Sequence, residues 1–286
     1  MRRINAGIQG NQLRSDRPLT VEQMYNVAPA IFATAAHPDR SERFSPIATF
    51  DVIKALSLEG FEPFMVAQTN SRDDLKRGYA RHMVRLRHQN ESSAEGSPEI
   101  ILGNALDGTG AYSITNGYFR MVCQNGLVTG DVLSTFKIPH TGKVTERVVE
   151  SCYSVLENFH KADDLMEEMK GTELAHQEML VFAESALKAR YGDDEPPVDP
   201  VKILKPRRRE DLRGDLWTTF NVVQENLIRG GASQRDKDCK KKSVRAITSV
   251  DRDVKLNQAL WVLAEGMLQI KNGTMSESQM RQYVAA

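Results

Sequence analysis

The residues of this chain with the clearest capacity for chemistry are arginines and lysines that gather in three short stretches. Residues 72–87, 202–213 and 235–245 each hold six basic and two acidic side chains, whereas the whole chain has 38 basic and 38 acidic residues. Segregated positive charge is typical of a phosphate-binding surface, because each neutralised phosphate of a nucleic acid releases condensed counterions. The simpler alternative is a solvated surface that faces acidic helices. The candidate nucleic-acid contacts in these stretches are Arg81, Arg85, Arg87, Arg207, Arg208, Arg209, Lys240, Lys241 and Lys242.

Arg120 is a separate candidate, because it is a single charge between apolar residues on both sides. It lies either on the solvent-facing side of a strand or inside the protein in an ion pair. Asp107 or Asp131 would be the internal partner, and a phosphate would be the functional one. Aromatic side chains on exposed strands can also stack on bases. The candidates for such stacking are Tyr112, Tyr118, Phe119 and Phe136, although core packing is the simpler explanation for the two phenylalanines.

Groups that could perform catalysis are sparse. Cys123 and His140 would form a dyad only if strand pairing joined them, and a buried cysteine is more often a small apolar side chain. Asp107 and Asp131 each precede a glycine and could meet as paired carboxylates, but Asp-Gly is first of all a turn signal. The sequence has neither a metal-binding pattern nor a phosphate-binding loop, so we predict no metal and no cofactor. Enzymatic activity is not favoured.

The bulk composition is that of an ordinary globular protein, with 286 residues of which 40% are hydrophobic and 27% are charged. Three isolated cysteines argue against a disulfide framework or a structural zinc site and indicate a reducing compartment. The first residues lack the apolar segment of a signal peptide. No stretch approaches the roughly 20 apolar residues that a membrane-spanning helix needs. We therefore expect a cytoplasmic protein without membrane contact.

The elements that must position these residues change in character along the chain. Residues 1–19 predict a flexible arm. Thr20 is an N-cap candidate for a helix to about residue 36, and Thr49 or Asp51 begins a second helix that Gly60 closes. Asp107-Gly108 and Asn125-Gly126 predict turns between strands. Extended segments are predicted at 64–69, 81–88 (with a charged side that faces solvent), 99–104, 112–122 and 127–138.

Beyond His140 the spacing of apolar residues indicates helices to the end of the chain. We expect them at about 148–171, at 172–191 with Thr172 as the cap, at 212–227 and at 251–270, with a proline-rich crossover at 192–206. The whole pattern predicts an α+β fold: a central, mostly antiparallel sheet with N-terminal helices and a C-terminal helical region packed on it. In domain terms, the arm of residues 1–19 precedes an α+β domain at 20–143 and a helical region at 144–286.

The central block and one later helix share a set of motif residues: Asn104, Asp107, Gly108, Tyr112, Phe119, Arg120, Val122, Cys123, Asn125, Gly126, Leu127 and His140, together with the helix around Trp217, Asn221, Glu225 and Asn226. This set resembles the domain of unknown function 932 family. The likeness spans residues 60 to 272. The family often has Ser-His where this chain has Ala105-Leu106, so a catalytic histidine at that position would be missing here.

Members of that family occur in plasmids, phages and prophages, so the resemblance implies a mobile-element setting and work on DNA or against host defences, without implying a reaction. Our leading hypothesis is non-enzymatic binding of single-stranded DNA through Arg120 and the basic stretches. One alternative is an inhibitor that binds a protein of a host defence system. The other is a hydrolase that uses Asp107, Asp131 or Cys123. The candidate partners are therefore single-stranded DNA and a host protein, and the oligomeric state is left open.

Overall fold

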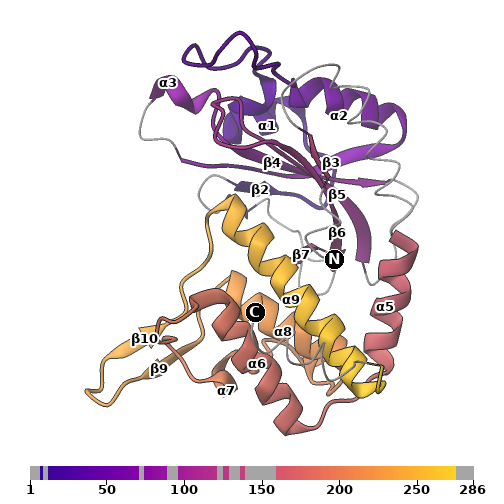
Figure 1. The fold of residues 1–286 in the computed structure, drawn as a ribbon, viewed down its shortest axis with the longest axis vertical. Helices are drawn as coiled ribbons and strands as arrows, with labels where there is room; N and C mark the ends of the chain where they lie inside the picture. The colour runs from indigo at the N-terminus through magenta and orange to yellow at the C-terminus, as the bar shows by residue number, and fades with distance from the viewer. Residues whose placement is uncertain are drawn as a thin grey trace. The chain divides into compact units, whose positions relative to one another are not determined.

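The structure, a computed structural model, describes residues 7–8, 12–70, 74–88, 96–120, 125–128, 136–138 and 159–274 (Figure 1). The chain divides into two compact units. The first holds Met1–Phe159 and Thr248–Val250, and the second holds His160–Ile247 and Asp251–Ala286. The α+β class is confirmed, because the first unit contains an antiparallel sheet and the second is mainly helical. The chain passes from the first unit to the second at Phe159 and His160. The predicted division at residue 143 lies outside the described residues and stays a prediction.

The sheet of the first unit is built from strands that each pair antiparallel with the next. Its order is β1 (Gly7–Ile8), β2 (Gln12–Arg14), β3 (Phe61–Gln68), β4 (His82–His88), β5 (Gly96–Asn104), β6 (Tyr112–Arg120) and β7 (Asn125–Val128), and β8 (Phe136–Ile138) also pairs with β6. Successive side chains of a strand point to opposite faces. The residues of each strand therefore alternate between the two faces of the sheet.

One face of this sheet carries the hydrophobic core beneath helices α1 (Val21–Val27) and α2 (Thr49–Leu58) (Figure 1). Val84 and Leu86 of β4 and Ile100 and Leu102 of β5 are among its fully buried residues. The short helices η1 (Pro29–Phe32) and α3 (Asp74–Arg77) complete the described helices of this unit.

The predicted helix ends were partly right. Thr20 caps the start of α1, as predicted, and the structure adds Gln23 as its partner in a capping box. The helix nevertheless ends at Val27 instead of near residue 36, because Pro29 has no backbone N–H and begins a separate 3₁₀ turn. Helix α2 begins at Thr49 and is followed by Gly60 at φ +89°, as predicted.

The prediction of a flexible arm over residues 1–19 is wrong for residues 12–19. Leu13 in β2 lies opposite Val66 in β3 and is 4% exposed. The backbone N–H of Leu19 donates to the carbonyl of Pro63 at 2.7 Å. The three-residue strand β2 therefore joins the sheet by burying its single apolar residue, Leu13, between the polar Gln12 and Arg14.

The two dipeptides expected to make turns differ in outcome. Gly108 has φ +75°, and Asp107 Oδ1 accepts hydrogen bonds from the backbone N–H and the hydroxyl of Thr109, so the Asp-Gly turn is confirmed. The Asn-Gly prediction is wrong. Asn125 lies opposite Arg120 in the sheet, so Asn125 and Gly126 begin strand β7 instead of making the turn before it.

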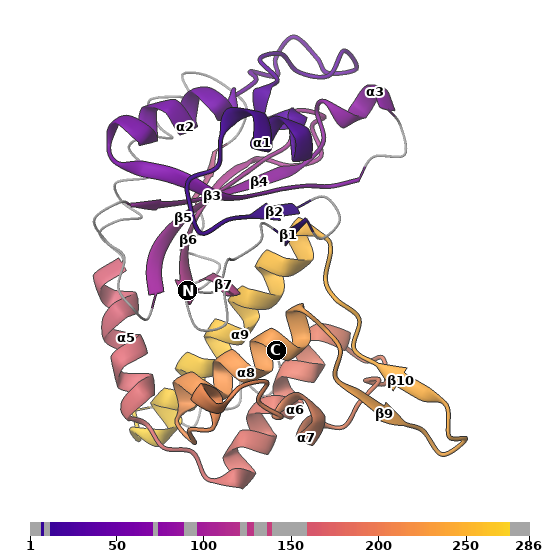
Figure 2. The ribbon, with the colours of Figure 1, turned by 180° about the vertical axis from the view of Figure 1, so that it is seen from behind.

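The second unit consists of helices and one hairpin (Figure 2). The elements are α5 (Phe159–Gly171), α6 (His176–Tyr191), α7 (Pro200–Ile203), η3 (Arg209–Asp211), α8 (Leu216–Ile228), the antiparallel strands β9 (Ser233–Arg235) and β10 (Lys241–Ser243), and α9 (Val250–Lys271). Every residue of α8 from Leu216 to Leu227 is buried.

Three predictions for this unit need correction. Thr172 does not cap α6. This helix begins at His176, and the backbone N–H of Ala175, just before it, donates a hydrogen bond to the Glu178 carboxylate. The proline-rich crossover contains the short helix α7, because Pro200 has the fixed φ that suits a first helical turn. The basic stretch after Gly231, which lies between the helices predicted at 212–227 and 251–270, forms a β-hairpin where no strand was predicted.

Candidate functional site

Two of the predicted DNA contacts, Arg85 and Arg87 of β4, are buried in an ion-paired cluster with Glu99 of β5. Arg85 Nη1 lies 3.0 Å from Glu99 Oε2, and Arg87 Nε lies 2.8 Å from Glu99 Oε1. The exposed fractions of the three residues are 1%, 2% and 0%. The predicted solvent-facing charged side of this strand is therefore wrong, and neither arginine is exposed to a nucleic acid in this structure.

The charge of Glu99 explains how this cluster is maintained. Burial raises the pKa of a carboxyl group, but the guanidinium groups of Arg87 and Arg85 outweigh burial and hold the pKa of Glu99 below its usual value. A buried ion pair of this kind adds little net stability over apolar packing, yet removing one partner leaves an uncompensated buried charge. Arg85 and Arg87 therefore have a structural role, because they neutralise Glu99 inside the sheet.

Asn104, which carries part of the family likeness, connects the sheet to α2. Its Nδ2 donates to the carbonyl of Ile47 at 2.8 Å and to the hydroxyl of Thr49 at 2.9 Å. The same hydroxyl lies 2.8 Å from His82 Nε2. Burial lowers the pKa of His82 to about 4, so this imidazole is neutral at pH 7 and completes a structural network.

The other predicted site residues of the first unit separate into three groups. Arg81 is half-buried, and Arg120 is 8% exposed at the end of β6. Tyr112 is fully buried, so it does not offer a ring for base stacking. Cys123, Asp131 and His140 lie outside the described residues. The thiol–imidazole dyad and the paired carboxylates therefore stay predictions.

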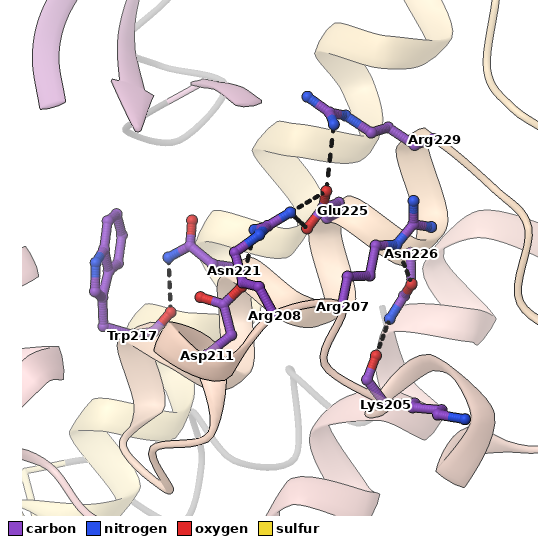
Figure 3. Close-up of polar contacts among 9 residues, drawn as sticks. All are labelled: Lys205, Arg207, Arg208, Asp211, Trp217, Asn221, Glu225, Asn226 and Arg229. Carbon is purple, nitrogen blue, oxygen red and sulfur yellow. Dashed lines mark hydrogen bonds and ion pairs between the residues drawn. The ribbon is translucent and has the colours of Figure 1, made fainter. Parts of the chain in front are cut away.

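In the second unit Arg208 is held by acids (Figure 3). Its Nη2 donates to both oxygens of Glu225, at 2.7 and 2.8 Å, and its Nη1 donates to Asp211 Oδ2 at 2.8 Å. Arg229 adds a contact of 3.3 Å to Glu225 Oε1. Glu225 itself is 2% exposed. Hydrogen bonds between a guanidinium and a carboxylate are stronger than those between neutral groups, so Arg208 anchors the loop before α8.

Arg207 and Asn226 form the second attachment of this loop (Figure 3). Arg207 Nε donates to Asn226 Oδ1 at 2.9 Å, and Arg207 Nη2 donates to the carbonyl of Gly230. Asn226 Nδ2 donates in turn to the carbonyls of Ile203 and Lys205, at 2.8 and 3.0 Å. Arg207 thus joins the loop to the end of α8 and to the start of the hairpin. We call Arg207, Arg208, Asp211, Glu225, Asn226 and Arg229 the polar clamp.

Trp217, the remaining predicted motif residue, is 5% exposed and stacks on Phe220 with ring centroids 5.7 Å apart. Its carbonyl accepts a hydrogen bond from Asn221. Trp217, Asn221, Glu225 and Asn226 therefore all lie buried in α8. The helix that resembles the family is a structural helix in this protein.

The third basic stretch forms a hairpin that extends away from the helices of its unit (Figure 2). Strands β9 and β10 pair Ser233 with Ser243, Gln234 with Lys242 and Arg235 with Lys241. Asp236 Oδ1 accepts hydrogen bonds from the backbone N–H groups of Asp238 and Lys240, which braces the turn. Lys240, Lys241 and Lys242 are exposed. We call residues 233–243 the basic ribbon.

The base of the basic ribbon is tightly built. Gly230 has φ +70°, and a Cβ atom there would lie 2.6 Å from the backbone of Ala246 and Val244, so only glycine fits this crossing. Arg190 of α6 donates to the carbonyls of Leu227 and Arg245. Since Arg207 also reaches Gly230, the basic stretches 202–213 and 235–245 meet at the base of the ribbon.

Comparison with known proteins places the chain among relatives. Residues 36–261 match the family described as a domain of unknown function (DUF932). The chain belongs to this family. Two relatives from Escherichia coli (strain K12), UPF0380 protein YafZ and UPF0380 protein YfjQ, are each 43% identical over 258 residues, which cover 90% of this chain and 94% of the relative. No solved structure matches the chain significantly.

The structure adds findings on membranes and metals. No helix among the described residues is long and apolar enough to cross a membrane. In the same part of the chain, no three His, Cys, Asp or Glu side chains gather closely enough to hold a metal ion.

Sequence reasoning missed the roles of two acids. Glu99 begins a run of apolar residues, and a lone acid in an apolar strand opposite a strand with alternating arginines could have indicated the buried cluster. Glu225 sits between Gln224 and Asn226 in a helix whose apolar residues recur on every turn, and this could have indicated a buried polar contact.

Proposed function

We propose that this chain is a non-enzymatic protein that binds single-stranded DNA, through the basic ribbon and the exposed residues near its base. The observation that carries the proposal is that the lysines of the basic ribbon are exposed, whereas Arg85 and Arg87 are buried in an ion-paired cluster and Arg207 and Arg208 are engaged in the polar clamp. In keeping with the family resemblance, the setting we propose is a plasmid, phage or prophage.

The set of contact residues is narrower than the sequence alone predicted. Arg85 and Arg87 are buried, and Arg207 and Arg208 belong to the polar clamp. Arg209 and Lys205 are exposed on the loop that the clamp holds. They extend the positive surface beyond the ribbon. We therefore assign DNA contact to Arg209 and to the basic ribbon, and we retain the half-buried Arg81 and the 8% exposed Arg120 only as residues to be tested.

The chemistry of the ribbon favours a polyanion over a folded protein as its partner. Protein interfaces are anchored by buried aromatic or apolar side chains surrounded by a polar rim. Residues 233–243 contain no aromatic residue and no aliphatic residue larger than alanine, while they carry five basic side chains. A surface of this kind gains binding energy from phosphate neutralisation and counterion release.

The proposal is tested by fluorescence anisotropy with a labelled single-stranded oligonucleotide of mixed sequence. We expect binding at low salt that weakens linearly on a logarithmic plot of affinity against salt, with a slope of about −0.7 for each phosphate neutralised. A matched duplex and an RNA strand measure the preference among nucleic acids. An unchanged anisotropy at low salt, with folded protein in excess, would contradict the proposal.

A further inference from the structure

We infer that the basic ribbon contacts DNA phosphates with one face only, the face that carries Ser233, Arg235, Lys241 and Ser243, and that this contact is independent of base sequence. The inference rests on the proposed function and assigns its contact surface. It starts from the register of the hairpin, in which Arg235 lies opposite Lys241 and Ser233 lies opposite Ser243. Directly opposed side chains of an antiparallel pair point to the same face.

The opposite face of the ribbon is directed towards its own unit. Gln234 Oε1 accepts a hydrogen bond of 2.9 Å from the backbone N–H of Asp199, at the start of α7. Lys242, which lies opposite Gln234, has its Nζ 3.9 Å from Glu195 Oε2. Because side chains alternate between faces along a strand, Arg235 and Lys241 must point the other way, towards solvent.

On the outward face Arg235 and Lys241 lie opposite each other, and a bound anion would reduce the repulsion between their charges. Two cations directly opposite each other on a ribbon repel, and this repulsion destabilises the pair. Asp236, the nearest acid in the sequence, uses its Oδ1 to accept backbone N–H groups of the turn. Lys241 has no ion pair among the residues that the structure describes, and Arg235 Nη1 donates to the carbonyl of Cys239 at 2.9 Å, which orients the guanidinium.

A phosphate between these two side chains would accept hydrogen bonds from the guanidinium of Arg235 and the ammonium of Lys241. The hydroxyls of Ser233 and Ser243 lie at the next pair along the same face. Such groups bind phosphate oxygens and position a nucleic acid without reading its bases. Stacking on aromatic rings gives single-strand binders much of their base contact, and the ribbon has no aromatic residue. Contact through this face should therefore be indifferent to base sequence.

The test compares two lysines that are adjacent in the sequence and lie on opposite faces. Lys241→Gln should weaken binding of a labelled single strand about fivefold at 0.1 M salt and reduce the salt slope by about 0.7, as expected for one lost phosphate contact. Lys242→Gln removes the same charge and should leave both quantities unchanged. The double variant Arg235→Gln/Lys241→Gln should reduce the slope by about 1.4. Oligo-dT and a mixed sequence should bind equally well.

The outcomes separate this inference from the proposed function. If the wild-type protein does not bind DNA, both fail. If it binds and Lys241→Gln has no larger effect than Lys242→Gln, the one-face assignment is overturned while DNA binding stands. A preference of tenfold or more for one base composition, lost in Lys241→Gln, would overturn the sequence independence. Binding of polyglutamate in place of DNA, with the same sensitivity to Lys241→Gln, would assign the face to an acidic protein. Equal melting temperatures of the variants confirm that the fold is intact.

Discussion

The basic stretch of the first unit and that of the ribbon have the same charge in the sequence and opposite situations in the structure. Arg85 and Arg87 lie in a sheet strand opposite a strand that supplies Glu99, and all three are buried. Arg235 and Lys241 lie opposite each other and are both exposed, and neither forms an ion pair with an acid among the residues that the structure describes. The comparison teaches that a cluster of positive charge is structural or functional according to what its partner strand carries.

The largest effect should come from removing the acid of the buried cluster. Glu99→Gln keeps the size of the side chain but leaves two buried guanidinium groups without their carboxylate, so we expect a loss of about 3–5 kcal/mol in the free energy of unfolding. Urea denaturation measures this loss. Lys241→Gln serves as the control and should change stability by no more than about 0.5 kcal/mol. Equal stabilities of the two variants would contradict the assignment of a structural role to the buried cluster and not to the ribbon.

The pH dependence of stability tests whether His82 is buried as a neutral imidazole in the first unit. The pKa of His82 is about 4 in the folded protein and about 6.5 when unfolded, so the unfolded chain binds more protons between these values. Stability should therefore be full above pH 6.5 and fall by about 3 kcal/mol as the pH drops to 4. The measurement is urea denaturation across this range. His82→Gln, which cannot titrate, should lose less stability over the same interval, and parallel curves would disprove the assignment.

Arg207→Gln should give an intermediate effect on the base of the ribbon. This variant removes the charged group that donates hydrogen bonds to Asn226 and Gly230, so the free energy of unfolding should fall by about 2 kcal/mol. DNA affinity should fall with little change in salt slope, because Arg207 positions the ribbon and does not itself contact phosphate. The nearby Arg209→Gln should show the reverse, with unchanged stability and a slope reduced by about 0.7. Denaturation and anisotropy on the same samples distinguish the two roles.

The smallest effect on stability is expected on the outward face of the ribbon. Arg235→Gln/Lys241→Gln removes two opposed like charges, so the free energy of unfolding should stay the same or rise by a few tenths of a kcal/mol, about 0.5 at most. Thermal unfolding monitored by circular dichroism measures this change. A loss comparable to that of Glu99→Gln would mean that these cations hold the ribbon together and would contradict their assignment to an external partner.

Local signals in the sequence were sufficient for several parts of the fold. The predicted N-cap Thr20 begins α1, the Asp107-Gly108 turn lies where it was expected, and Gly60 follows α2. Each of these features depends on residues within four positions of one another. The site was less predictable. Of the predicted DNA contacts, Lys240, Lys241 and Lys242 proved exposed, while Arg85 and Arg87 were buried by pairing with Glu99 of the next strand, 14 and 12 positions away.

By itself, the sequence determined the fold class, the family and the presence of three basic stretches. Only the tertiary structure decided which of these stretches is free to bind a partner. The physical reason is that burial and ion pairing depend on strand register. Arg87 meets Glu99 because β4 and β5 pair in one register, and Lys241 meets Arg235 because the hairpin turns at Asp236. Positive charge is a property of the residue, whereas its availability is a property of the residues that the fold places opposite it.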